Sequence, residues 1–206
     1  MHCGTDTSKS DTLVVPLFPL PNVVFFPRAV LPLHIFEERY KTMTADALAG
    51  NRLVAMALLR PGWEKNYYAR AAIEPVVCVG KIVNSERLED GKYNFLLHGR
   101  SRARIIEEEA STPYRIARVQ TLPAPAMLEI DLANQRQQLI EMICGEPLVS
   151  LPGTEELKRI VTSPMGTGEV ADLLAFHLLS NVGLKQSLLA DIDVPRRVSR
   201  LIAALA

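Results

Sequence analysis

The chain has 206 residues, of which 48% are apolar and 22% are charged, and its 23 basic side chains equal its 23 acidic ones. This composition excludes a disordered chain and argues against a global attraction to nucleic acid or to an anionic membrane. The cysteines Cys3, Cys78 and Cys144 form no CxxC pair, so the sequence supports neither a disulfide framework nor a metal site, and it fits a reducing cytoplasm.

The N-terminal region combines a polar start with a strongly apolar segment. Residues 1–11 are polar and are expected to form a flexible tail. Residues 13–40 are rich in Val, Leu and Phe, but five prolines and several charged side chains interrupt them. A membrane-spanning helix needs about 20 consecutive apolar residues, and a signal peptide ends in a small-residue cleavage pattern. We therefore expect neither a membrane span nor a signal peptide.

The first half of the chain predicts a sheet with one helix. Short apolar runs bounded by proline or by turn residues favour strands, and apolar side chains at helical spacing follow Glu37. The expected strands cover 12–18, 29–36, 52–59, 76–88, 92–107 and 114–122, and the expected helix covers 37–49. Asp90 and Gly91 indicate a hairpin, but a two-residue turn would set Glu86 opposite Phe95, which favours a longer loop or a bulge. Residues 60–75 show no period and predict a long loop.

The second half predicts helices. A long segment over 128–143 has few helix breakers, Thr154 can cap a short helix, and apolar residues at helical spacing occupy 170–178. Asp193 can cap a last helix whose apolar face runs to Leu205. Strands followed by helices predict an α+β fold rather than an alternating βαβ fold.

Three blocks of the sequence resemble a known family. "VPLFPLPNVVFFPRAVLPLHIFEERY", "DALAGNRLVAMALLRPGW" and "VGKIVNSERLEDGKYNFLLHGRSRARI" occur in the order found in the N-terminal substrate-recognition domain of Lon proteases. The similarity is greatest to small stand-alone proteins that carry this domain, and the later "LLSNVGLKQSLLADIDVPRRVSRL" resembles the helices that follow it. The resemblance implies a PUA-like twisted β pseudo-barrel with a helix over 12–123 and a helical bundle over 124–206. It also implies that the barrel strands turn corners, where prolines fit.

The same resemblance implies a protein that recognises unfolded or exposed hydrophobic polypeptide and that has a separate protease as a candidate partner. The GxxxxGK[ST] phosphate loop of the Lon ATPase does not occur, and the chain does not extend to the region of the Ser–Lys protease domain. We therefore expect a non-enzymatic module without a cofactor. The sequence leaves the client proteins and the oligomeric state open.

Aromatic residues are the candidates for peptide binding. Trp63, Tyr67 and Tyr68 lie in the long loop, where they can act as binding anchors or fold back onto the barrel. Together with Phe25 and Phe26 they are the candidate lining of an apolar groove for an extended peptide.

A basic strand provides the alternative function. His98, Arg100, Arg102 and Arg104 share one parity of a predicted strand, which places them on one face. This face can bind an anion or RNA, as PUA-like folds do, or it can be an ordinary solvated face balanced by nearby glutamates. Since the chain is neutral, nucleic acid is not the expected partner.

No residue pattern indicates catalysis. His177 falls on an apolar helical face and is interpreted as a core residue, whereas His34 is expected to bond locally. Cys78 lies within an apolar strand and is interpreted as a small buried hydrophobic residue. No serine or cysteine has the sequence context of an activated nucleophile.

Overall fold

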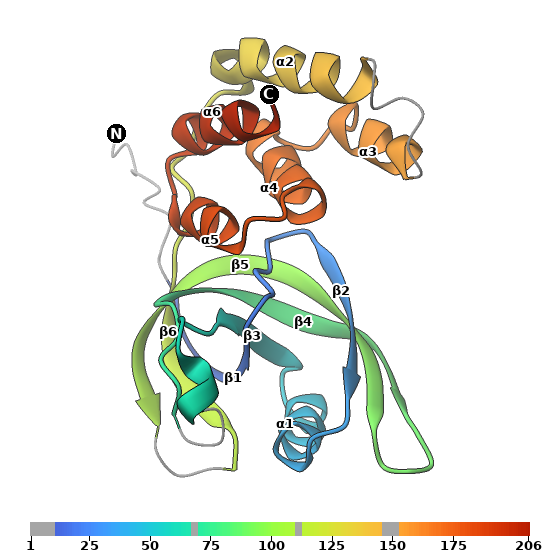
Figure 1. Ribbon diagram of the computed structural model, residues 1–206, viewed down its shortest axis with the longest axis vertical. Helices are drawn as coiled ribbons and strands as arrows, with labels where there is room; N and C mark the ends of the chain where they lie inside the picture. Colours follow the sequence, from blue (N-terminus) through green and yellow to red (C-terminus); the bar gives the residue numbers. More distant parts are fainter. Residues whose placement is uncertain (1–10, 67–69, 110–112, 146–152) are drawn as a thin grey trace, which may run out of the picture.

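The computed structural model describes residues 11–66, 70–109, 113–145 and 153–206. The strands are β1 (Thr12–Leu20), β2 (Val30–Ile35), β3 (Leu53–Leu58), β4 (Val76–Arg87), β5 (Tyr93–Glu109) and β6 (Arg115–Thr121). The helices are α1 (Glu38–Ala49), α2 (Ala133–Cys144), α3 (Thr154–Val161), α4 (Thr167–Leu178), α5 (Val182–Ala190) and α6 (Val194–Leu205), with short 3₁₀ turns η1 (Trp63–Asn66) and η2 (Glu129–Leu132). The strands and α1 form one end of the molecule, and α2 to α6 stack at the other end (Figure 1).

Five of the strands close into a barrel. The strand order is β2-β5-β4-β3-β1-β6, and a further pairing of β5 with β6 closes the sheet on itself. The 17-residue strand β5 makes this possible because its first half pairs with β2 and its second half pairs with β6. Register shifts along β5 and β4 mark bulges, which bend strands and increase their twist. The predicted α+β fold with a barrel before the helices is confirmed.

The topology explains the prolines of the first strands. β1 pairs with β6 over Thr12–Leu17 and with β3 over Leu17–Leu20, so Pro16 and Pro19 each face a partner strand on one side only. Pro32 lies in β2, which pairs only with β5 among the described strands. Proline cannot donate a backbone hydrogen bond, and it is tolerated where one side of a strand has no ladder.

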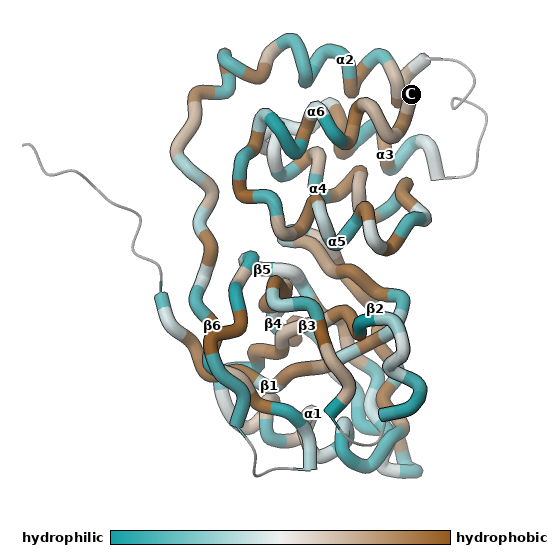
Figure 2. The backbone as a smooth tube through the Cα atoms, turned by 60° about the vertical axis from the view of Figure 1, so that its left-hand side comes forward, coloured by the Kyte–Doolittle hydropathy of each residue, from teal (hydrophilic) through white to brown (hydrophobic). Residues whose placement is uncertain are grey.

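Two apolar clusters hold the molecule together. Small residues from all five barrel strands fill the barrel interior, among them Val15, Ala55 and Ala103. A larger cluster extends from α1 through the outer side of the barrel into the bundle, and it includes both Met43 and Leu174. Figure 2 shows hydrophobic residues along the barrel strands. The bundle is therefore joined to the barrel by continuous apolar packing.

The elements differ from the sequence prediction in a few places. The β4–β5 connection spans residues 88–92, with Glu86 opposite Asn94, so the expectation of a longer loop is confirmed. Gly153 rather than Thr154 occupies the N-cap of α3, and the predicted helix over 128–143 is divided into η2 and α2. Asp193 caps α6, as predicted, because its Oδ1 accepts a hydrogen bond from Arg196 N at 2.9 Å. No helix within the described ranges is long and apolar enough to cross a membrane.

Candidate functional site

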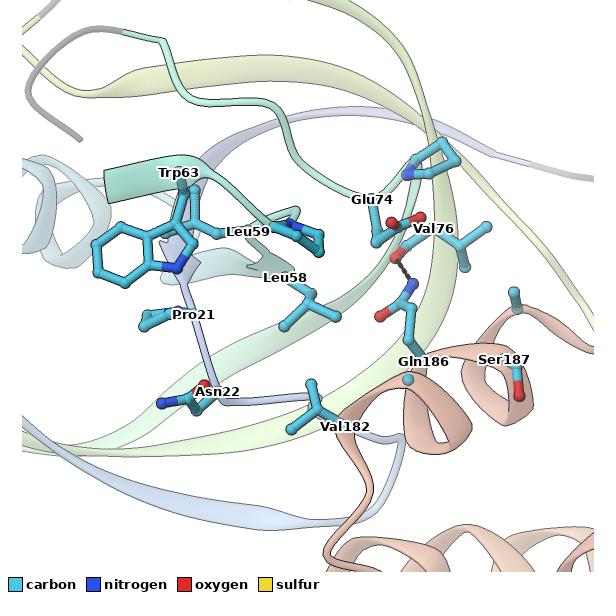
Figure 3. A pocket seen from close by; sticks show the side chains of 14 residues that line it. Pro21, Asn22, Leu58, Leu59, Trp63, Glu74, Val76, Val182, Gln186 and Ser187 are labelled. Atoms are coloured by element: carbon cyan, nitrogen blue, oxygen red, sulfur yellow. Dashed lines mark hydrogen bonds between the residues drawn. The ribbon is translucent and has the colours of Figure 1, made fainter. Parts of the chain in front are cut away.

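A hollow of about 640 Å³ lies where the barrel meets α5 (Figure 3). Its volume falls within the usual range of ligand sites, about 300–1,000 Å³. Four parts of the chain form its walls: the segment directly after β1, the end of β3 with the following loop, the start of β4, and one side of α5. The lining is mainly apolar and includes Pro21, Leu58, Leu59, Pro61, Trp63, Pro75, Val76 and Val182.

The loop that carries Trp63 is anchored at both ends. Leu59 and Ile73 form an isolated antiparallel bridge, and Arg60 N donates to Ala72 O at 2.8 Å. Between them the chain turns at Gly62, whose φ of +84° favours glycine, and enters the η1 turn at Trp63. The predicted long loop therefore contains a short 3₁₀ turn and a strand bridge, which hold Trp63 beside the hollow.

The opposite wall is α5, which is fixed to the barrel by polar contacts. The Asn181 side chain caps the helix by accepting a hydrogen bond from Leu184 N at 2.8 Å. Gln186 Nε2 donates to the carbonyl oxygen of Val76 in β4 at 2.9 Å. The first bond stabilises the start of α5, and the second ties the helix to β4 beside the hollow.

Most other polar side chains on the lining are engaged with the protein itself. Arg60 Nε donates to Glu74 Oε1 at 3.1 Å. Ser187 donates to Leu184 O and accepts a hydrogen bond from Arg200 Nη2 at 2.6 Å. Among the residues described, no group of His, Cys, Asp or Glu side chains could hold a metal ion. The hollow thus offers apolar contact area, and its geometry suits binding.

The predicted peptide-binding residues separate into three groups. Trp63 lies on the hollow. Phe25 and Phe26 are 1% and 0% exposed, so they are core residues and do not line it. The segment that carries them lies close against β5 at Gly99. Any larger residue there would place its Cβ only 2.1 Å from Phe26 O, so the glycine permits this close approach. Tyr67 and Tyr68 lie outside the described residues.

The basic residues of β5 do not form one exposed face. Arg100 and Arg104 are exposed, and His98 is half-buried, but Arg102 is only 7% exposed. The reason is that helices of the bundle cover the outer side of β5 at Arg102. A register shift also leaves Arg100 without an opposing residue in β4. The shared parity predicted one face, but the packing of the bundle divides it.

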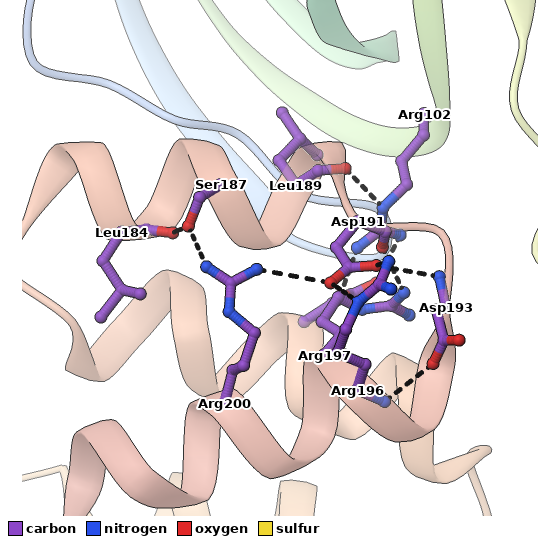
Figure 4. A network of polar contacts seen from close by, with 10 residues as sticks. Arg102, Leu184, Ser187, Leu189, Asp191, Asp193, Arg196, Arg197 and Arg200 are labelled. Carbon is purple, nitrogen blue, oxygen red and sulfur yellow. Dashed lines mark hydrogen bonds and ion pairs between the residues drawn. The ribbon is translucent and has the colours of Figure 1, made fainter.

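Arg102 instead belongs to a buried ionic cluster, formed by Arg102, Asp172 and Arg197 (Figure 4). Arg102 Nη1 and Nη2 donate to the two carboxylate oxygens of Asp172 at 2.8 and 2.5 Å. Its Nε donates to Leu189 O at the end of α5. Arg197 Nε lies 3.0 Å from Asp172 Oδ1, and Arg197 Nη1 donates to Asp191 O. This ionic cluster links β5, α4, α5 and α6.

Burial and charge shift the pKa of groups at this junction. Desolvation lowers the pKa of the Arg197 guanidinium, which Asp172 partly offsets. Hydrogen bonding from Arg196 lowers the pKa of the Asp191 carboxyl, to which Arg200 also contributes. Burial strongly raises the pKa of the Cys78 thiol, so Cys78 is an unreactive buried side chain, as its sequence context indicated.

Two histidine predictions have different outcomes. His177 is exposed, with its ring edge against Phe176, so its interpretation as a core residue is wrong. The neighbouring Phe176 and Leu178 are half-buried and pack against the apolar core, so His177 is the exposed residue of this last turn of α4. His34 Nδ1 lies 2.7 Å from Asn94 Oδ1 on the neighbouring strand, so its partner is local in space but distant in sequence.

The block that resembles the helices of the family includes α5, but the residue patterns did not single out this helix or Gln186. A usable signal was present, because Asn181 directly precedes an apolar helical segment and is a favourable N-cap residue. Within that helix Gln186 shares a face with Val182 and Leu189. A polar side chain on an apolar face indicates a buried hydrogen bond, which the contact with Val76 provides.

The fold and the site define a class of protein: a small β-barrel followed by a helical bundle, with an apolar hollow where the two meet. The family model for the substrate-binding domain of the ATP-dependent protease La (LON) matches residues 14–206, and the chain belongs to this family. The resemblance seen in the three sequence blocks is thereby confirmed.

Similar proteins agree with this assignment. The Lon protease of Dictyoglomus thermophilum is 27% identical over 188 residues, which cover 91% of this chain and 24% of that protein. The Lon protease of Trichlorobacter lovleyi is 29% identical over 202 residues, which cover 94% of this chain and 24% of that protein. This chain therefore spans about a quarter of the length of these relatives.

Solved structures show the same fold. The N-terminal domain of a Mycobacterium avium complex Lon protease superposes with a TM-score of 0.72 at 17% identity, and 94% of this chain and 98% of that chain are covered. A Lon N-terminal domain protein from Xanthomonas campestris superposes with a TM-score of 0.66 at 21% identity, and 93% of this chain and 98% of that chain are covered.

Proposed function

We propose that this protein is a non-enzymatic recognition module that binds exposed apolar segments of polypeptides in the hollow between the Trp63 loop and α5. The observation that carries the proposal is the apolar lining contributed by both the barrel and the bundle. The family description supports it, since the matched family is the substrate-binding domain of a protease.

The physical basis of binding is the burial of apolar surface. Each square ångström of apolar surface removed from water contributes about 25 cal/mol, so even one large apolar side chain can add measurable affinity. Trp63 supplies a broad, rigid contact area with few rotatable bonds, which is the property of binding anchors. An unfolded segment exposes such side chains, whereas a folded client keeps them in its core.

We also propose that the bound segments are presented to a separate protease. The relatives carry the matched region as about a quarter of a longer Lon protease. The free thiols of Cys78 and Cys144 are compatible with action in the reducing cytoplasm. The alternative function, anion or RNA binding by the β5 arginines, has less support because Arg102 is buried and paired with Asp172.

The proposal is tested with the substitution Trp63→Ser and a reduced, carboxymethylated protein that carries a fluorescent label and stays unfolded. Fluorescence anisotropy is expected to show binding that weakens about tenfold in Trp63→Ser, because a hot-spot aromatic contributes 1–2 kcal/mol or more. Arg104→Gln is the control, since Arg104 is exposed on β5 and does not line the hollow.

The outcomes separate the two candidate functions. Unchanged affinity in Trp63→Ser, with thermal unfolding like that of the parent protein, would contradict the proposal. Loss of binding in Arg104→Gln together with a steep salt dependence would instead support the basic-strand alternative.

A further inference from the structure

Gln186 is the only buried polar side chain on the hollow within the part of the chain that the structure describes. It is 8% exposed. Its Nε2 donates to Val76 O at 2.9 Å. A backbone carbonyl can only accept a hydrogen bond, so the nitrogen of the amide must face β4 and the oxygen must face away from it. Figure 3 shows the Gln186 oxygen turned toward the hollow.

The Oε1 atom of Gln186 accepts no hydrogen bond from any described residue. This oxygen is not among the fully buried unpaired atoms of the described residues, so water in the hollow can reach it. A ligand that fills the hollow removes this water, and the acceptor then needs a donor from the ligand. The helix cap at Asn181 and the bond to Val76 hold the amide in this orientation. The acceptor is thus fixed in direction before any ligand arrives.

The surrounding lining offers few donors to a ligand. The backbone N–H of Leu59 donates to Leu20 O, and that of Glu74 donates to Leu58 O. Glu74 presents a carboxylate, which only accepts, and the Asn22 amide lies at the exposed rim. Prolines, which have no N–H, occupy three positions of the lining: Pro21, Pro61 and Pro75. The indole of Trp63 carries a further N–H on the lining, but no described residue donates to Gln186 Oε1, so only a ligand with its own donor can pair with this oxygen.

We propose that Gln186 is a specificity-determining residue of the hollow, and that its Oε1 accepts a hydrogen bond from a backbone N–H of an extended apolar segment. This inference rests on the proposed function, since it assumes that the segment lies between Trp63 and α5. It names the ligand class more narrowly. An acyl chain or a detergent offers the same apolar surface without an N–H, whereas every non-proline residue of a polypeptide carries one.

The test uses a labelled hexapeptide with a central Leu-Phe pair between Gly and Ser residues, and versions of it with one backbone nitrogen methylated at a time. With the parent protein, methylation at one position is expected to weaken binding about tenfold, because it leaves the buried acceptor unpaired. Replacing that same amide by an ester, which removes the N–H without adding a methyl group, is expected to weaken binding similarly. A dodecyl chain is expected to compete poorly.

The variant Gln186→Met keeps the approximate length and volume of the side chain but removes the acceptor, together with the Nε2 donor to Val76 O, so its effect is read only in comparison with the modified peptides. It is expected to bind the unmodified peptide about tenfold more weakly than the parent protein and to bind the methylated peptide no more weakly than the unmodified one. This double comparison isolates the one hydrogen bond from other effects of methylation. Should Gln186→Met not fold, the ester series on the parent protein gives the same information.

The failures are distinguishable. In the first case the hexapeptide binds and Trp63→Ser weakens its binding, but no single methylation or ester replacement does, or the dodecyl chain competes equally well. The role of Gln186 is then overturned, and the apolar site stands. If the hexapeptide binds equally to the parent protein and to Trp63→Ser, the proposed function itself is overturned.

Discussion

The barrel and the bundle meet in two regions of opposite character. At the hollow the contact is open and apolar, and among the described residues one hydrogen bond, from Gln186 to Val76, joins its two walls. At the ionic cluster of Arg102, Asp172 and Arg197 the contact is charged, and its side chains are buried although they border a second hollow of about 370 Å³. Helix α5 belongs to both regions, since Ser187 lines the hollow and Leu189 O accepts from Arg102. The comparison teaches that one side of the junction is suited to fixing the two halves and the other to binding.

The ionic cluster is costly to disturb because its charges are buried together. Arg102 and Arg197 share one carboxylate, and Arg197 is only 3% exposed. Bringing charges out of water is unfavourable, so the net contribution of such a cluster to stability can be small. Removing one partner is different, since the remaining charges stay buried without compensation.

The largest expected effect comes from Asp172→Ala. It leaves two buried guanidinium groups without their shared carboxylate, so the free energy of unfolding is expected to fall by about 3–5 kcal/mol. Urea unfolding followed by circular dichroism measures the change. Asp131→Ala, at an exposed position in η2, is the control and should change stability by less than about 0.5 kcal/mol. A loss below about 1 kcal/mol in Asp172→Ala would show that the cluster does not hold the junction.

A smaller effect is expected from Asp191, which Arg196 and Arg200 pair at the edge of the same region. The folded-state pKa of Asp191 is lowered from 3.8, so its contribution to stability is complete above that value and is lost as the pH falls below it toward the folded-state pKa. Asp191→Asn is expected to reduce stability by about 1.5–3 kcal/mol at neutral pH. It should also remove part of the acid sensitivity below about pH 4, since the pKa of Asp191 is lowered from 3.8 in the folded state. Urea unfolding across that range measures both, and an unchanged acid profile would contradict the assignment.

The smallest effect is expected from Asn181→Ala, which removes the cap of the helix that walls the hollow. The cost in stability should be about 1 kcal/mol, and peptide binding should weaken slightly because α5 is less well fixed. Asp193→Ala is the matched control, since it removes the cap of α6 at a similar cost without touching the hollow. Equal effects of the two variants on binding would indicate that α5 does not shape the site.

Sequence patterns predicted the barrel better than the site. Alternation, turn residues and prolines are local, so the strands and the longer β4–β5 connection could be predicted from neighbouring residues. The burial of Arg102 could not be predicted in this way. Alternation indicates the face of a strand on which a side chain lies, but not whether a helix 70 residues later in the chain covers that face. Phe25 and Phe26 show the same limit, since aromatic residues in an irregular segment suit a core as well as a groove.

The candidate site was predictable only in part for the same reason. Trp63 was identified from its loop, whose ends are tied by contacts close in sequence. Its counterpart Gln186 lies more than a hundred residues away, and only the packing of α5 on β4 brings the two walls together. A hollow between distant segments leaves no continuous pattern in a single sequence.

The pairing of β1 with β6 has a consequence for how the chain folds. Thr12 lies opposite Gln120, so the ring of strands closes only when nearly the first and nearly the last of its residues meet. Long-range pairing of this kind slows folding. During synthesis on the ribosome the first half of β1 must wait for β6, and we expect any nascent chain shorter than about 120 residues to leave the stretch around Val15 without its partner strand and exposed to chaperones.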